Sequence, residues 1–199
     1  MPAGPSEVEV IADESANPAF IAADFLSQAE HGVDSQAMLV TASEKIVEPV
    51  MQAIREQLDR LPRKEITEKS LGHSRIVVLK DKQEVVDFTN LYAPEHLIIQ
   101  TTDYADIAGQ IENAGSVFMG PYTPESAGDY ASGTNHTLPT NGYAKAYSGV
   151  NLDSFIKKIT FQEITADGIR QLGGTIQTMA ANEQLDAHKN AVTIRLNTL

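Results

Sequence analysis

The feature that most constrains the fold is an alternation of short apolar runs with longer stretches in which apolar residues recur at helical spacing. Short apolar runs are typical of buried strands, and parallel strands need helical crossovers between them. The pattern predicts an α/β fold: an incomplete Rossmann-like, mostly parallel sheet covered on both faces. The predicted strands are 8–12, 37–41, 75–79, 96–100 and 116–119.

Capping signals support the helices between these strands. Asn17 and Pro18 are typical of an N-cap and a first helical residue, and Ser43 can cap the next helix. The predicted helices are 17–31, 43–58, 65–71, 83–91 and 104–112.

A long polar loop follows, from 120 to about 150, rich in Gly, Pro, Ser, Thr and Asn. Loops longer than about 12 to 15 residues are usually functional or disordered, and we favour function because this one carries Asp129 and His136.

We divide the chain into three parts on this basis. Residues 1–122 form a partial Rossmann-like α/β domain, 123–151 an active-site loop segment contributing to a second α/β domain, and 152–199 a mainly helical C-terminal tail. Within the tail we predict a strand at 159–161, a helix from 166 past 179 and a helical segment at about 183–191.

Composition narrows the possible partners. The net charge of −12 repels nucleic acid and anionic membranes, so we expect neither as a partner. Cysteine is absent, which excludes disulfides and thiolate ligands and leaves His, Asp, Glu and Gln for any transition metal. No run approaches the roughly 20 apolar residues of a membrane span, and the first residues do not resemble a signal peptide. We expect a cytoplasmic protein.

Gln28 and His31 close the first predicted helix. Their i, i+3 spacing puts both on one face, where they could reach one metal ion. His31 could equally complement the helix C-terminal dipole before Gly32.

Glu95 and His96 stand at the entrance to a predicted strand, directly after Pro94. There both side chains could reach one cleft, with a carboxylate to activate water and an imidazole to carry protons near neutrality. A solvated pair at the edge is the alternative.

The remaining candidates are scattered. Asp129 is a possible oxygen ligand, although an Asx turn also explains it, and His136 could contact a metal or a substrate. Glu183 and His188 are close enough in sequence to flank one cavity, and we interpret His73 as a surface histidine. Fingerprints of dinucleotide binding, zinc proteases, P-loops and serine hydrolases are missing.

Several of these segments together closely resemble histidinol dehydrogenases, in the family's order and over essentially the whole chain. The segments that carry the resemblance are Ala3-Gly4-Pro5-Ser6-Glu7, 26–32 (LSQAEHG), 92–98 (YAPEHLI), 120–139 (GPYTPESAGDYASGTNHTLP) and 187–192 (AHKNAV).

The resemblance implies NAD-dependent oxidation of L-histidinol to L-histidine through L-histidinaldehyde. It implies a Zn²⁺ site and a pair in which Glu95 activates water and His96 acts as acid and base. The implied zinc ligands are Gln28, His31, Asp129 and His188. The implied substrate contacts are these four residues with Ser6, Glu95, His96, His136 and Glu183.

Family members are homodimers with a shared active site, so the resemblance implies that Glu183 and His188 serve the partner's site. Family members also carry about another half of the protein before the Ala3-Gly4-Pro5 segment, including contacts to NAD. We therefore expect a fragment whose cofactor-binding residues lie elsewhere. A non-catalytic zinc-binding or interaction module and a zinc hydrolase using Glu95 are the alternatives.

Overall fold

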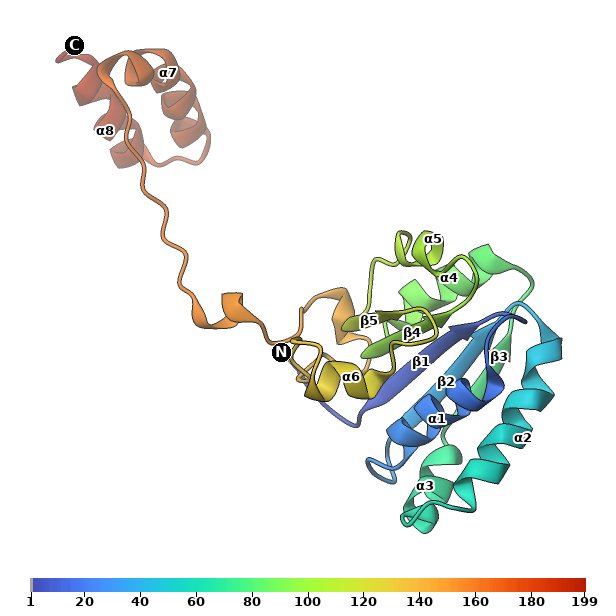
Figure 1. Cartoon of the computed structure of the whole chain (residues 1–199). Coiled ribbons are helices and arrows are strands. Elements are labelled where there is room, and N and C mark those ends of the chain that lie inside the picture. Colours follow the sequence, from blue (N-terminus) through green and yellow to red (C-terminus); the bar gives the residue numbers. More distant parts are fainter. Residues whose placement is uncertain (1) are drawn as a thin grey trace. The chain divides into compact units, whose positions relative to one another are not determined.

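The computed structural model describes residues 2–199 and divides into two compact units, Met1–Ile156 and Lys157–Leu199. The first unit is built around a five-stranded sheet in the order β3-β2-β1-β4-β5, in which every pair is parallel (Figure 1). The strands are β1 (Glu7–Ala12), β2 (Gln36–Thr41), β3 (Arg75–Val78), β4 (His96–Gln100) and β5 (Ser116–Met119).

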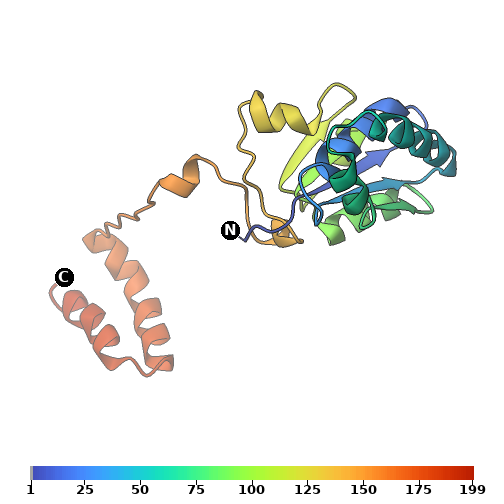
Figure 2. The same ribbon diagram turned by 90° about the horizontal axis from the view of Figure 1, so that it is seen from below.

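Helices cover both faces of this sheet, as the view from below shows (Figure 2). The helices of the first unit are α1 (Pro18–Ala29), α2 (Val47–Leu58), α3 (Lys64–Leu71), α4 (Lys82–Tyr92), α5 (Tyr104–Ala108) and α6 (Glu125–Tyr130), with 3-10 turns η1 (Glu44–Ile46), η2 (Tyr143–Lys145) and η3 (Leu152–Phe155). Asn17 caps α1 as predicted, through a hydrogen bond from the Ala19 amide.

Alternate residues of each strand supply the two cores, because successive side chains point to opposite faces. Val10 packs with α1 and α2 on one face, whereas Ile11 packs with α4 and α5 on the other. The predicted parallel α/β fold is therefore confirmed. The α5 helix is shorter than predicted. It ends at Ala108, and the residues up to Ile111 form isolated hydrogen-bonded turns.

The second unit is a helical hairpin of α7 (Ala166–Asn182) and α8 (Asp186–Leu196). Gly173 allows the two helices to pack closely, because a Cβ there would lie 2.7 Å from Leu196 Cδ1. Nowhere in residues 2–199 does a helix combine the length and apolar character that crossing a bilayer requires.

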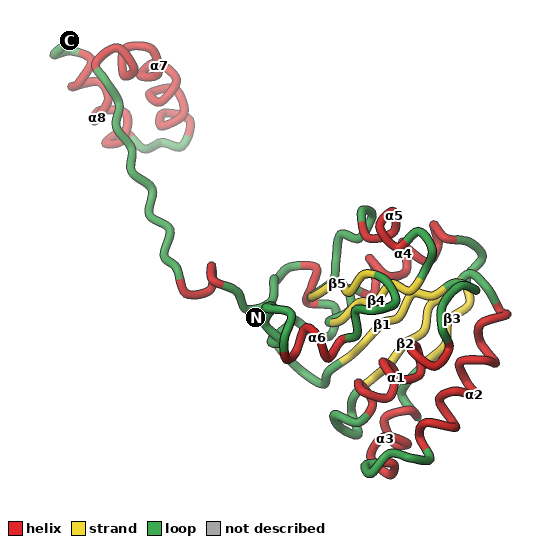
Figure 3. Tube along the Cα trace, in the orientation of Figure 1, coloured by secondary structure: helices red, strands yellow, loops and turns green. Residues whose placement is uncertain are grey.

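The chain differs from the predictions in three further places; the coloured trace shows helix α6 and the loop before α7 (Figure 3). The predicted strand 159–161 is not formed, because a strand needs a hydrogen-bonded neighbour and the described sheet ends elsewhere; Phe161 is 91% exposed. The long loop contains α6, so Asp129 lies on a helix. The last helix starts at Asp186, and Glu183 is the C-cap of α7.

Candidate active site

Parallel pairing brings the predicted acid–base pair to the amino edge of the sheet. Val8 of β1 stands opposite His96 of β4, so Ser6, just before β1, lies beside Glu95, just before β4. The α1 helix runs back against the strands, and its last turn therefore reaches the same edge.

Glu95 is buried and held by two donors. Its Oε2 accepts from Ser6 Oγ at 2.7 Å and from the Glu7 amide at 2.9 Å. Burial raises the pKa of Glu95 to about 7, helped by the charges of Glu7 and Asp129 and opposed by these two hydrogen bonds. A carboxyl with a pKa near neutrality is suited to taking a proton from water.

His96 is fixed in one tautomer. Its Nδ1 lies 3.1 Å from the Glu7 carbonyl oxygen, which can only accept, so Nδ1 carries the proton and Nε2 keeps a lone pair. Nε2 is buried and makes no hydrogen bond within residues 2–199. Because burial also lowers the pKa of His96, the ring is a neutral imidazole whose free nitrogen can accept a proton.

Gln28 lies fully buried in the last turn of α1, with its amide next to Ser6. Ser6 Oγ is 3.4 Å from Gln28 Oε1, but Ser6 has one hydroxyl proton and the shorter bond gives it to Glu95. Gln28 Nε2 is buried without a partner in the described chain. Turning the amide over lets Nε2 donate to Ser6 Oγ and leaves Oε1 free as a ligand oxygen.

The α6 helix adds two carboxyl groups. Asp129 and Glu125 are one helical turn apart, and one ligand atom from each, with one from His31, lie within 4.8 Å of one another. Glu125 is buried, and its Oε2 has no hydrogen-bond partner among residues 2–199. Burial raises the pKa of Glu125 to about 9, with the nearby acids Asp129, Glu95 and Asp24 adding to the rise.

This donor set fits Zn²⁺. It offers an imidazole nitrogen and carboxylate oxygens and no thiolate, and the Gln28 amide lies beside Ser6 at the same edge of the sheet. Orphaned buried polar atoms beside the donors are what a cation or substrate would satisfy.

Glu125 was not a candidate in the sequence analysis. The signal was present, because it stands four residues before Asp129 and a helix puts both on one face. The glycine and aspartate of this segment indicated turns instead, which hid the helix.

The other predicted residues lie outside this cluster. His136 is exposed after α6, although its charge is near enough to oppose protonation of His96. Glu183 and His188 belong to the second unit, where both are exposed. His73 is exposed after α3, as its interpretation as a surface histidine requires.

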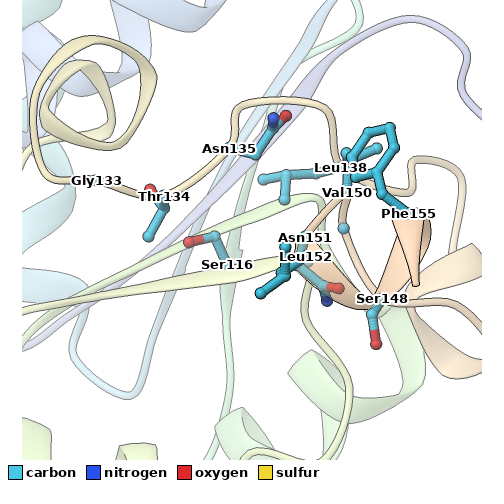
Figure 4. Close-up of a pocket in the computed structure, with 12 residues that line it drawn as sticks. Ser116, Gly133, Thr134, Asn135, Leu138, Ser148, Val150, Asn151, Leu152 and Phe155 are labelled. Carbon is cyan, nitrogen blue, oxygen red and sulfur yellow. The ribbon is translucent and has the colours of Figure 1, made fainter.

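A separate cavity of about 700 Å³ opens beside the start of β5 (Figure 4). Ser116, Asn135 and Leu138 line it, with the segment 148–155 on another side. It contains none of the predicted residues, so the acid–base pair and the cavity are neighbouring but different features of the first unit.

The fold and the site together define a class: a doubly wound α/β domain with a buried carboxylate–imidazole pair beside a candidate metal site. Comparison with known proteins narrows this class. The family model for histidinol dehydrogenase matches residues 1–196, and the chain belongs to the histidinol dehydrogenase family.

Individual relatives agree. The chain is 68% identical to histidinol dehydrogenase of Bacteroides fragilis and 58% identical to the chloroplastic histidinol dehydrogenase of Arabidopsis thaliana, in each case over 100% of its length. It spans 46% and 43% of those proteins. A crystal structure of histidinol dehydrogenase from Elizabethkingia anophelis matches with a TM-score of 0.95 and 57% identity, over 100% of this chain and 46% of that one.

Proposed function

We propose that this chain carries the zinc- and substrate-binding part of a histidinol dehydrogenase, which oxidises L-histidinol to L-histidine through L-histidinaldehyde in the cytoplasm. The observation that carries the proposal is the buried Glu95–His96 pair, with the free Nε2 of His96 next to the cluster of His31, Glu125 and Asp129.

Gln28, His31 and Asp129 are the proposed zinc ligands within the first unit. Zinc, when bound, would act as a Lewis acid that orients the imidazole and amine of histidinol. Ser6 and His136 would contact the substrate. His188 would complete the metal shell and Glu183 would contact the substrate, both from a second copy of the chain in a homodimer.

The chain's own residues would move the protons. In the first oxidation, His96 Nε2 takes the hydroxyl proton while the carbon gives a hydride to NAD⁺, which yields the aldehyde. Glu95 then takes a proton from the water that adds to the aldehyde carbon, and His96 gives its proton to the carbonyl oxygen, which forms the hydrate and leaves the imidazole neutral again. In the second oxidation, His96 again accepts the hydroxyl proton as the hydrate gives a second hydride to NAD⁺, which leaves the carboxylic acid of histidine.

We further propose that NAD binds mainly in the part of the relatives that this chain does not span; the chain spans 46% of such a relative and carries no dinucleotide-binding fingerprint. Turnover therefore needs to be measured both with the chain alone and with the rest of the protein supplied separately.

The test is NADH formation from histidinol, Zn²⁺ and NAD⁺. We expect Glu95→Gln and His96→Asn each to lower kcat by roughly 10² to 10⁴-fold, in keeping with general acid–base catalysis. His73→Asn is the matched control and should leave kcat unchanged, because His73 is exposed and outside the site. Zinc binding without turnover in either preparation would favour the non-catalytic binding module, and turnover that survives both variants would refute the assigned roles.

A further inference from the structure

One residue holds both members of the acid–base pair through its main chain. The Glu7 amide donates to Glu95 Oε2 at 2.9 Å, and the Glu7 carbonyl accepts from His96 Nδ1 at 3.1 Å. The same peptide segment therefore fixes the position of the carboxylate and the tautomer of the imidazole. A small shift of this segment would move both groups together.

The Glu7 side chain anchors that segment on the opposite side. It is 5% exposed, and its carboxyl oxygens accept from Tyr92 Oη at 3.2 Å and from the Asn141 amide at 3.1 Å. Tyr92 ends α4 just before the pair, and Asn141 lies in the segment that follows His136. Glu7 thus ties the start of β1 to both neighbouring segments.

Both anchoring segments need to be held in place. Ala93, next to Tyr92, has φ 57° and Asn141 has φ 56°, values that are uncommon for residues other than glycine. Such backbone persists where surrounding contacts determine it. The Glu7 carboxyl supplies one contact to each segment.

We propose that Glu7 is a positioning residue for the Glu95–His96 pair: its main chain holds both side chains, and its buried carboxyl fixes that main chain to Tyr92 and Asn141. This inference rests on the proposed function, because the pair must carry the proton transfers for its position to matter.

Substitutions at Glu7 can distinguish a role in positioning the Glu95–His96 pair from the general effect of removing a buried acid. Glu7→Ala removes both anchors. Glu7→Gln keeps them, since Oε1 can accept from the Asn141 backbone amide and Nε2 can donate to Tyr92 Oη, whose single proton can then go to Gln36 Oε1, 3.1 Å away, instead of to residue 7. Glu9→Ala is the matched control, because Glu9 is also a buried acid of β1 on the same face but contacts Thr89 and not the pair.

The measurements are kcat, the KM for histidinol and thermal stability. We expect Glu7→Ala to lower kcat by roughly tenfold or more with KM within about threefold, and Glu7→Gln to restore kcat to within about threefold of the wild type. Glu9→Ala should lose stability yet keep its kcat. Equal losses of kcat in Glu7→Ala and Glu9→Ala would overturn the proposal. Tyr92→Phe, which removes one anchor and keeps the ring, replaces Glu7→Ala if that variant does not fold.

A readout independent of turnover is the His96 tautomer, seen in ¹⁵N NMR of the imidazole ring. The wild type and Glu7→Gln should show the Nδ1–H form, and Glu7→Ala should shift towards a mixture. An unchanged tautomer in a folded Glu7→Ala variant would overturn the proposal. A wild type that shows the Nδ1–H form without turnover, even with the rest of the protein, would instead count against the proposed function.

Discussion

The first unit buries several acidic side chains, a residue type that is usually exposed. Five carboxyl side chains are buried in it, while no lysine or arginine is buried in residues 2–199. Burying a charge without a partner is costly, so these groups hold protons or face a cation. The buried acids are Glu7, Glu9, Asp24, Glu95 and Glu125.

Glu9, which is remote from the proposed metal ligands, makes this effect measurable. Burial raises its pKa from 4.5 to about 8, so the folded chain retains a proton that the unfolded chain releases. Stability should therefore fall as the pH rises through this interval, by on the order of 5 kcal/mol for this group. Glu9→Gln should match the wild type near pH 5 and exceed it at pH 9 in urea unfolding. Parallel pH profiles for the two proteins would contradict the assignment.

The α6 helix is the element on which the candidate metal site depends. Its Gly128 packs on β5, since a Cβ there would lie 2.6 Å from Phe118 Cε1. Glu125 and Asp129 stand on either side of this contact along the helix. Any residue larger than glycine would push the helix and its two carboxyl groups away from the sheet.

Gly128→Ala should thus lower the free energy of unfolding by about 1 to 3 kcal/mol and weaken zinc binding. Gly174→Ala is the control, because a Cβ there meets nothing within 4 Å and alanine favours the helix. Calorimetric titration with Zn²⁺ and urea unfolding check both variants. Zinc affinity unchanged in Gly128→Ala would argue against α6 as a source of ligands.

The spacing of apolar residues along the sequence was enough to predict most of the helices and strands of the first unit. The five strands and the helices between them were predicted because burial on both faces leaves an apolar signature in each strand. The helix α6 was missed because Gly128 is chosen for a contact with Phe118, which lies on another element. Residues 159–161 have strand composition, but composition does not supply a neighbouring strand.

The sequence also predicted only part of the candidate site. Pro94 and the following strand left two interpretations of Glu95 and His96 open, a shared cleft or a solvated edge, and in the structure both side chains are buried, with Ser6 hydrogen-bonded to Glu95. Glu7 carried no sequence signal, since its contacts with the pair are made by main-chain atoms.

At the scale of the whole molecule, the proposal needs residues from both units and two copies of the chain. His31→Ala and His188→Ala should each bind zinc poorly and turn over slowly. If the site is shared across a homodimer, co-expressing the two variants should restore about a quarter of wild-type activity, because half of the dimers are mixed and each has one intact site. Absence of recovery, with mixed dimers demonstrated, would place His188 in its own protomer's site or outside any site.

We propose that zinc binds at the amino edge of the sheet, where the end of α1 and α6 bring His31 and Asp129 together. Anomalous diffraction at the zinc edge, from crystals of the zinc-loaded chain, tests it most directly. We expect one strong peak about 2.0 to 2.2 Å from a nitrogen of His31 and an oxygen of Asp129. A zinc-loaded crystal with no peak there, or with its zinc at His73 instead, would contradict it.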